Sequence, residues 1–484
     1  MGHDLQMKNF AWKEGSGISD IYPGALVFDG VDDYGVCENF PILTKEKGYT
    51  VVALRSYLAE SIGYLVYNGT NAKQSAFAFE RSDSLDTWSW GKNSSIRNLL
   101  PKLMSYQTSN SYNNNIISTG TVIEGEKLIR IASVGGYSNV AIWELVFLDH
   151  DATEEELTKI KDYFVKTYPW LFPDQAWTVT GKTNEDEDRA TIANITGNGN
   201  NLVLSNFGFS EGSGYGLYAY NFNDRSWISV PDYGVISDKT SKSFNIKSFV
   251  LADYPVLYTA VNKDSSIKKV KIKVTNSIPG FYFGNKPANQ IIDLSTDGIY
   301  EIPSYNSPND ATQYGFRCSN VNDSCNITIE QIPEYEGYLV TDGVDDKIVS
   351  SSFGMGKDFT IVGDWKFIDN KKSGTGLVKG SSFYIYNTMI GLDLYINSGS
   401  VTNSLDGIKS INAACSDGRA YDRNWNEILA NTGNVVGSGG MFEVSSSGGR
   451  FDRIAFKNFA IYPRILSKDD CIKAYNYLQT LKAK

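Results

Sequence analysis

Two acidic loops carry the residues best suited to chemistry in this chain. Each reads Asp-Gly-Val-Asp-Asp, first at 29–33 and again at 342–346. Carboxylates grouped on a glycine-containing turn can bind Ca²⁺, which takes about six to eight oxygen ligands. The same residues can instead form a tight turn whose carboxylates accept backbone N–H groups. The candidate Ca²⁺ ligands are Asp29, Asp32, Asp33, Asp342, Asp345 and Asp346.

Aromatic clusters are the candidate sugar-binding groups, because aromatic faces stack on pyranose C–H groups while polar groups bind the hydroxyls. We expect two tryptophans near residue 89 to share one face of a strand. A further cluster lies between two glycines near residue 282, and a single tryptophan follows Arg423. For each cluster the alternative is a place in a hydrophobic core or at its rim. The candidate stacking residues are Trp88, Trp90, Phe281, Tyr282 and Trp425.

Catalytic constellations are scarce. The chain has 2 histidines, His3 and His150, which leaves little material for a histidine-based triad or metal centre. Among 5 cysteines there is no Cys-x-x-Cys motif, and only Cys318 and Cys325 are placed to pair. Retaining glycosidases need two carboxylates about 5 Å apart, and no strand carries the alternating acidic motif for that role. We therefore predict that the chain is not an enzyme.

The composition is that of a β-rich, multidomain globular protein. The 484 residues suffice for several domains, and 44 Gly, 30 Tyr and 24 Phe argue against a coiled coil or a disordered chain. A net charge of -10 would repel a phosphate backbone, so nucleic acid is not an expected partner. No apolar stretch approaches about 18 residues, and we expect neither membrane insertion nor a secretory signal.

An internal repeat defines the domains. Residues 24–33 recur at 337–346 with eight of ten positions identical, an offset of 313, whereas residues 2–17 recur at 199–214, an offset of 197. The second copy therefore carries an insert of about 116 residues. The first copy begins at Met1 inside its motif, which predicts a truncated front and a longer parent protein. The predicted domains are 1–172, 173–217 plus 335–484, and the inserted 218–334.

Short runs rich in β-branched and aromatic residues predict strands throughout, for example at 359–367. Helices are expected only at 153–166 and 467–481. Each begins with a capping-box pattern, Thr153 with Glu156 and Ser467 with Asp470. So many strands and so few helices indicate antiparallel sandwiches.

Three motifs together resemble one fold family. They are Ile-Thr-Gly-Asn-Gly-Asn-Asn-Leu at 195–202, the two acidic loops, and a late strand with a capped helix at 451–470. Both long bodies resemble the concanavalin A-like, laminin-G-type jelly roll, and the insert resembles a jelly roll of the carbohydrate-binding-module type. The resemblance implies an all-β fold of tandem antiparallel jelly-roll sandwiches, with a smaller β-sandwich inserted in the second.

The module order resembles fibre or appendage proteins of crAss-like and other Bacteroides phages. That resemblance implies a virion structural protein of a head or tail fibre, folded in the host cytoplasm, with adhesion to host surface polysaccharide. Its expected partners are further copies of itself, as a homotrimer or alternatively a dimer, and other virion proteins. No cofactor is expected apart from Ca²⁺. The alternative is a secreted bacterial carbohydrate-binding protein, or a non-catalytic accessory region of a glycoside hydrolase.

Overall fold

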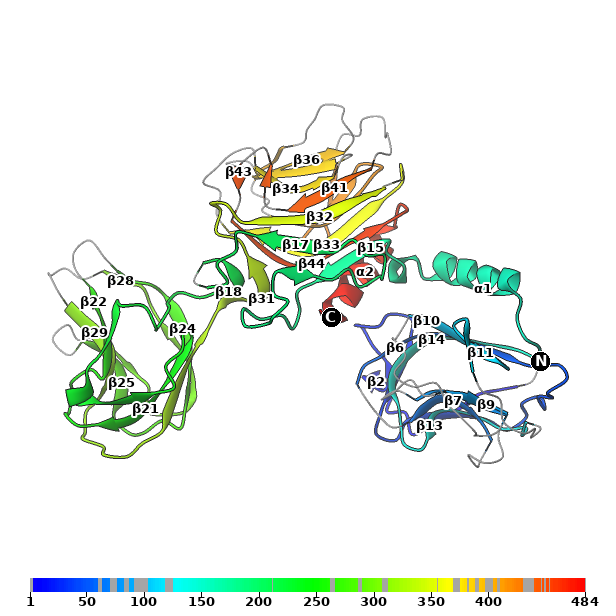
Figure 1. Cartoon of the computed structure of the whole chain (residues 1–484), viewed down its shortest axis with the longest axis horizontal. Helices are drawn as coiled ribbons and strands as arrows, with labels where there is room; N and C mark the ends of the chain where they lie inside the picture. The colour runs from blue at the N-terminus through cyan, green and yellow to red at the C-terminus, as the bar shows by residue number, and fades with distance from the viewer. Residues whose placement is uncertain are drawn as a thin grey trace. The chain divides into compact units, whose positions relative to one another are not determined.

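The structure is a computed structural model, and its described residues are mostly β-structure, in antiparallel sheets with two α-helices (Figure 1). The chain divides into two compact units, residues 1–172 with 467–480 and residues 173–466 with 481–484. The described residues are 3–59, 63–69, 76–81, 87–90, 103–117, 125–210, 212–261, 266–285, 290–306, 312–354, 356–368, 375–380, 383–387, 391–396, 404–406, 410–429, 439–444, 446–447, 450–451 and 453–483.

The first unit contains a two-layer β-sandwich, with β7, β9 and β13 in one layer and β6, β10 and β14 in the other (Figure 1). One sheet has the order β1 (Gln6–Lys8), β5 (Tyr34–Cys37), β13 (Ile129–Val134), β7 (Tyr64–Asn68), β8 (Phe77–Arg81) and β9 (Trp88–Ser89). The other has the order β12 (Asn115–Ile116), β11 (Ser111–Tyr112), β10 (Met104–Thr108), β6 (Thr50–Tyr57), β14 (Asn139–Leu148), β4 (Leu26–Asp29), β3 (Gly17–Ile18) and β2 (Lys13–Glu14).

The second unit contains another pair of sheets. One has the order β18 (Gly214–Leu217), β31 (Glu334–Val340), β44 (Ile454–Tyr462), β33 (Thr360–Phe367), β38 (Ile411–Cys415), β39 (Arg419–Asp422) and β40 (Glu427–Leu429), and β15 (Gln175–Thr178) also pairs with β44. Its partner has the order β16 (Thr191–Ile192), β17 (Leu202–Ser205), β32 (Lys347–Gly354), β41 (Gly439–Val444), β34 (Thr375–Gly380), β35 (Phe383–Asn387), β36 (Gly391–Ile396) and β37 (Ser404–Asp406). β42 (Ser446–Ser447) and β43 (Arg450–Phe451) form a separate two-stranded sheet next to β34.

Two further sheets lie wholly within residues 227–332 of the second unit and enclose their own core, which includes Phe244, Ile272 and Phe316. The first contains β19 (Trp227–Ser229), β22 (Leu257–Val261), β29 (Thr312–Cys318), β25 (Phe281–Asn285) and β26 (Gln290–Asp293). The second contains β20 (Gly234–Ser237), β21 (Ser243–Phe249), β30 (Ile327–Ile332), β24 (Val270–Thr275) and β27 (Gly298–Ile302). A short pair, β23 (Ser266–Ile267) with β28 (Tyr305–Asn306), and the 3-10 helix η2 (Pro231–Tyr233) complete this segment.

The central strand pair has the same register in both units. In the first unit β6 pairs with β14 from Thr50 opposite Leu148, and the register shifts between Ile142 and Glu144. In the second unit β33 pairs with β44 from Thr360 opposite Tyr462, and the register shifts at the equivalent point. A β-bulge inserted at one position in both copies supports the internal duplication inferred from the sequence.

Both predicted helix starts are confirmed. In α1 (Glu154–Thr167) the Thr153 side chain accepts the Glu156 N–H while the Glu156 carboxylate accepts the Thr153 N–H. In α2 (Lys468–Thr480) the Ser467 hydroxyl accepts the Asp470 N–H at 3.1 Å. Helix α1 runs into the 3-10 helix η1 (Pro169–Leu171). No helix among the described residues is long and apolar enough to cross a membrane.

The unit division places α2 differently from the predicted domains, which assigned 467–484 to the second sandwich. Residues 467–480 group with the first unit, where the Tyr477 ring centroid lies 6.1 Å from that of Trp143. The three predicted domain boundaries otherwise stay predictions. The Cys318–Cys325 pairing is not formed, because neither of these two cysteines is in a disulfide.

A buried ion pair joins the two sheets of the first unit. Arg55 on β6 and Glu80 on β8 are 1% and 0% exposed, and the Arg55 Nε donates to Glu80 at 2.8 Å. Tyr57 and Tyr112 donate to the same carboxylate at 3.0 and 2.7 Å. By register the second unit has Trp365, 2% exposed, where the first has Arg55. One sandwich therefore fills this core position with a charge and the other with an aromatic ring.

The pairing of β18 with β31 yields a test of the insert. Leu217 lies opposite Glu334 in this pair, so the two ends of the intervening segment are adjacent. We expect replacement of residues 218–333 by an Asn-Gly turn to leave the second sandwich folded, because a two-residue turn closes such a strand pair. Far-UV circular dichroism and thermal unfolding check this. An insoluble or non-cooperative product would contradict the predicted boundaries.

The buried ion pair yields a second test. We expect Arg55→Met to destabilise the first unit by about 3–5 kcal/mol, because it leaves the Glu80 charge buried without its partner. Adding Glu80→Gln removes that charge and should recover about half of the loss. Urea unfolding of the full chain at neutral pH measures both. If the double variant is no more stable than Arg55→Met alone, the unpaired charge of Glu80 is not the cause of the destabilisation.

Candidate functional site

A cleft of about 570 Å³ lies in the first unit between the β10–β11 hairpin and helix α1. The hairpin contributes a tyrosine ring and two hydroxyl groups, and the β11–β12 turn that follows it contributes two amides. The helix contributes a carboxylate and an ammonium group. The lining residues are Met104, Tyr106, Thr108, Ser111, Asn113, Asn114, Ala152, Glu154, Leu157, Thr158 and Lys161.

The hairpin wall is held by its own polar side chains. The Tyr106 hydroxyl donates to the Asn114 side chain at 2.6 Å, and the Tyr106 N–H donates to the Asn113 side chain at 3.0 Å. Asn113 and Asn114 both have positive φ, 43° and 68°, which asparagine tolerates better than most residues. Burial, and then the charge of Glu154, raise the pKa of Tyr106, so its hydroxyl is protonated at neutral pH.

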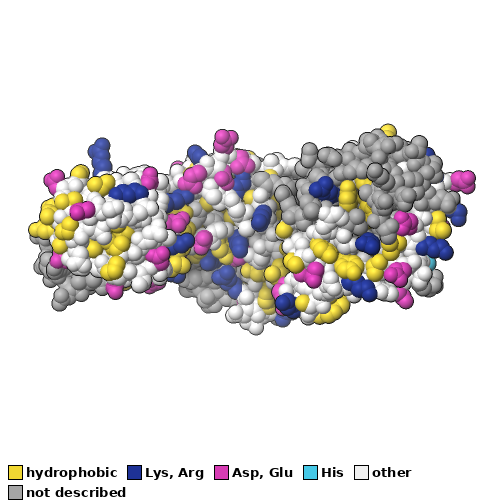
Figure 2. All heavy atoms as spheres, turned by 90° about the horizontal axis from the view of Figure 1, so that it is seen from below, with side chains coloured by type: hydrophobic (Ala, Val, Ile, Leu, Met, Phe, Trp, Pro, Cys, Tyr) yellow, Lys and Arg dark blue, Asp and Glu magenta, His cyan; other side chains and the backbone are white. Residues whose placement is uncertain are grey.

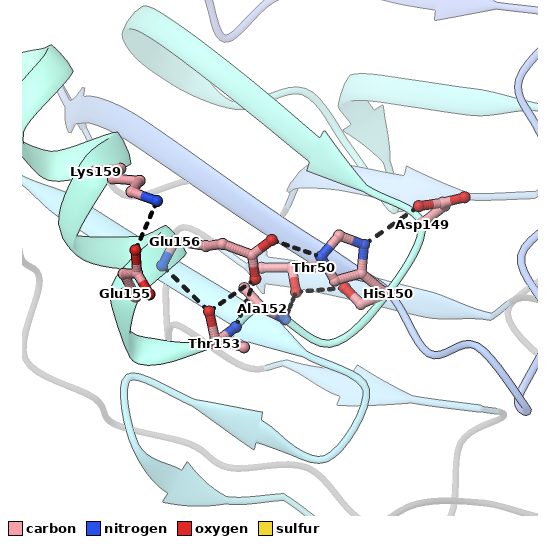
Figure 3. Close-up of polar contacts among 8 residues, drawn as sticks. All are labelled: Thr50, Asp149, His150, Ala152, Thr153, Glu155, Glu156 and Lys159. Carbon is pink, nitrogen blue, oxygen red and sulfur yellow. Dashed lines mark hydrogen bonds and ion pairs between the residues drawn. The ribbon is translucent and has the colours of Figure 1, made fainter.

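The helix wall is positioned by the loop that precedes α1 (Figure 3). The Thr50 hydroxyl donates to the His150 carbonyl at 2.8 Å and accepts the Ala152 N–H at 2.7 Å. Asp151 accepts both the N–H and the hydroxyl of Ser109, at 2.7 and 2.6 Å, which ties this loop to the turn of the β10–β11 hairpin. Both walls of the cleft are therefore fixed to one short loop.

The His150 side chain extends this network toward the helix start. Figure 3 shows its ring between Asp149 and Glu156, at 3.3 and 3.1 Å. Hydrogen bonds to Asp149 and then Glu156 raise the pKa of His150. Hydrogen bonds from the Thr153 backbone and then its hydroxyl lower the pKa of Glu156 to about 2. Glu156 is thus engaged in capping α1, and the group has the arrangement of a helix cap rather than of a catalytic pair.

The predicted stacking residues of the first unit are in its interior. Trp88 and Trp90 are each 1% exposed. Trp90 has φ of 49°, and the two rings enter different apolar clusters, Trp88 beside Tyr67 and Trp90 beside Tyr49. The expectation that they share one face of a strand is wrong. Rings this buried have no free face for a sugar.

Phe281 and Tyr282 are also buried, at 0% and 6% exposure, and the Tyr282 hydroxyl donates to Asp253 at 2.9 Å. Trp425 differs, because it is half-buried in a turn closed by Asp422 and lies 6.2 Å from the Tyr421 ring centroid. Of the five candidate rings, Trp425 alone retains a partly accessible side chain.

The acidic loops bring their carboxylates together as the sequence suggested. In each loop one oxygen from each of the three aspartates lies within 4.8 Å of the others. The loop itself uses several of these oxygens. Asp29 accepts the N–H groups of Val31 and Asp32 at 2.7 and 3.2 Å, and Asp342 accepts those of Val344 and Asp345 at 2.7 and 3.3 Å.

The last aspartate of each loop is buried. Asp33 and Asp346 are 0% and 1% exposed, and each accepts the N–H of the first aspartate of its loop. The hydroxyl of Ser213 donates to Asp346 at 3.1 Å. Burial raises the pKa of Asp346 to about 6 and raises that of Asp33. These contacts are those of a turn cap, and Ca²⁺ binding by the six aspartates stays a prediction.

Comparison with known proteins identifies no sequence family. No family model and no curated protein matches the chain. The solved structures that resemble it include a botulinum neurotoxin type C structure described as dependent on two ganglioside molecules for cell entry, at 10% identity and TM-score 0.28 over 96% of this chain and 94% of that one. Another is the Trypanosoma rangeli sialidase with the inhibitor DANA, at 9% identity and TM-score 0.23 over 59% and 67%. Such similarity is distant.

The raised pKa of Asp346 yields a test of both readings of the acidic loops. Because the folded pKa, about 6, exceeds the ordinary value of 3.8, the folded chain binds this proton more tightly than the unfolded chain. We therefore expect wild type to gain stability relative to Asp346→Asn as the pH falls from 7 to 4.5. Chemical denaturation across this range, with and without Ca²⁺, measures the difference. Stabilisation by Ca²⁺ at pH 7 that is lost in the variant would establish a metal site, whereas no Ca²⁺ effect would leave the turn cap.

Proposed function

We propose that this chain binds carbohydrate without turning it over, and that the cleft between the β10–β11 hairpin and α1 is a binding site. The observation that carries the proposal is the composition of the cleft wall. It combines the Tyr106 ring with the amides of Asn113 and Asn114 and the hydroxyls of Thr108 and Ser111. A ring for the C–H face of a sugar and several polar groups for its hydroxyls are what such a ligand requires.

The described lining supports binding rather than hydrolysis. Glu154 is the one carboxylate among the residues that line the cleft, whereas glycoside hydrolysis usually needs two carboxyl groups on either side of the bond. Tyr106 remains protonated at neutral pH and serves as a hydrogen-bonding group. The role proposed for this surface is therefore adhesion.

We further propose the biological setting that the sequence resemblance implies. Both large bodies are taken as concanavalin A-like jelly rolls, and the protein as a fibre or appendage subunit of a tailed-phage virion. The lack of a disulfide between Cys318 and Cys325 fits a protein folded in a reducing cytoplasm. A homotrimer would supply several copies of a weak glycan site, and such multivalency raises avidity by about 10² to 10⁴.

The cleft yields a direct test with a panel of bacterial surface polysaccharides. We expect Tyr106→Ala to weaken binding by about tenfold, because it removes the ring face and the donor to Asn114. Tyr163→Ala is the matched control, since Tyr163 is an exposed tyrosine on α1 outside the cleft lining. Glycan arrays or surface plasmon resonance measure the affinities, and thermal unfolding confirms that both variants fold.

Two outcomes would contradict the proposal. Equal binding by wild type and Tyr106→Ala would remove the cleft as the site. Sustained release of new reducing ends from a bound polysaccharide would show turnover and overturn the non-catalytic role.

A further inference from the structure

A second cluster of charged and aromatic side chains lies on one sheet of the second unit. Its members come from the neighbouring strands β31, β44 and β33 and from the end of β39. Adjacent residues on these strands, among them Leu339, Phe456 and Trp365, enter the hydrophobic core. Because side chains alternate along a strand, Tyr338, Asp364, Lys366 and Lys457 lie on the opposite face of the sheet. Tyr335, where φ is 59°, departs from this alternation and joins them through the Lys366 ammonium. We call the whole group the sheet-face cluster; it comprises Tyr335, Tyr338, Asp364, Lys366, Arg423 and Lys457.

One buried carboxylate organises the cluster. Asp364 is 5% exposed, and the Tyr338 hydroxyl donates to it at 2.8 Å. The Arg423 guanidinium approaches its other oxygen at 3.5 Å, with 45% of the arginine side chain exposed. Tyr338 and Arg423 are thus held in place while the outer part of the guanidinium stays accessible.

Aromatic rings and two lysines complete the cluster. The Lys366 ammonium lies 4.3 Å from the Tyr335 ring centroid and 4.9 Å from that of Tyr338. The Lys457 ammonium lies 5.8 Å from the Tyr338 ring on the same side of the sheet. Cations over ring faces at these distances are attracted by the ring quadrupole, which aligns them without neutralising them.

The cluster carries an excess of positive charge on an acidic chain. Three cations face two carboxylates, Asp364 and the neighbouring Glu334. Burial, and then the charge of Arg423, lower the pKa of Lys366, whereas the charges of Asp364 and Glu334 act in the opposite direction. Figure 2 shows one face of the molecule, on which Lys and Arg are interspersed with Asp and Glu. The whole chain has net charge -10, so this excess is local.

The fold itself does not require these charges. By register, the first unit has Leu54 where the second has Asp364, and Trp143 at the bulge where the second has Lys457. Leu54 and Trp143 are 0% and 6% exposed and are apolar. The same sheet position is thus built without charge in one copy and with a charged cluster in the other.

We propose that the sheet-face cluster is a binding site for acidic carbohydrate, with a sugar carboxylate between Lys366 and Arg423 and a sugar ring against the tyrosines. Arginine and lysine pair with carboxylates by charge-assisted hydrogen bonds, and the tyrosines supply the ring faces. A nucleic acid is disfavoured because the chain is acidic overall and only three cations gather here. The inference rests on the proposed carbohydrate-binding function and names a ligand class at a second site.

The experiment compares polygalacturonate with its carboxyl-reduced, neutral form. We expect wild type to bind the acidic polymer at least about tenfold more tightly at low salt, and the preference to shrink as salt screens the charges. Lys366→Met/Lys457→Met and Arg423→Gln should each reduce this preference. The control is Lys271→Met/Lys273→Met, which removes two exposed lysines from β24. Thermal unfolding compares the stability of all variants.

The outcomes separate this proposal from the cleft site. Loss of the charge preference in the cluster variants, but not in the lysine control or Tyr106→Ala, supports the sheet-face site. Equal binding of both polymers by wild type overturns it, even if the cleft binds neutral glycan. Retention of the preference by both cluster variants also overturns it, as does tighter binding of a single-stranded oligonucleotide than of polygalacturonate.

Discussion

In each unit, one threonine hydroxyl on the first strand of the central pair holds the segment that follows the second strand. Thr50 bonds to the His150 carbonyl and the Ala152 N–H, and Thr360 bonds in the same way to Arg464 and Leu466. Both hydroxyls are buried at the start of the central strand. Because a buried hydroxyl without partners is costly, this position holds the segment in one place. In the first unit the same segment carries α1, and the proposed cleft depends on it.

The two sandwiches share the register of the central strand pair but differ in the side chains at equivalent positions. At one core position the first unit uses Arg55, paired with Glu80, and the second uses Trp365. On the opposite face of the same strands, Leu54 in the first unit corresponds to Asp364 in the second. Charge therefore lies inside one copy and on the outer face of the other. Duplication preserved the backbone register while each copy acquired its own polar group.

Local features formed by residues close together in the sequence were predictable from the sequence. The acidic loops and the N-caps of both helices depend on residues within a few positions of each other, and the structure contains them, with a full capping box at Thr153 and Glu156. Burial was not predictable in the same way. Trp88 and Trp90 look like a surface pair only if the strand alternates regularly, and the positive φ of Trp90 breaks that alternation. A strand covered on both faces also leaves no exposed side to recognise.

Sites assembled across the chain were missed for a related reason. The cleft joins the 104–114 hairpin to α1, and the sheet-face cluster joins residues as distant as Tyr338 and Lys457. Two sequence patterns could have indicated these sites. They are Ser-Tyr-Asn-Asn-Asn at 111–115 and Asp-Trp-Lys at 364–366, and both are common in strands and turns. Only the register of the sheets brings these side chains together. In a mostly β chain of this kind, strand order determines which side chains share a surface, and local motifs mainly determine how tightly its loops are held.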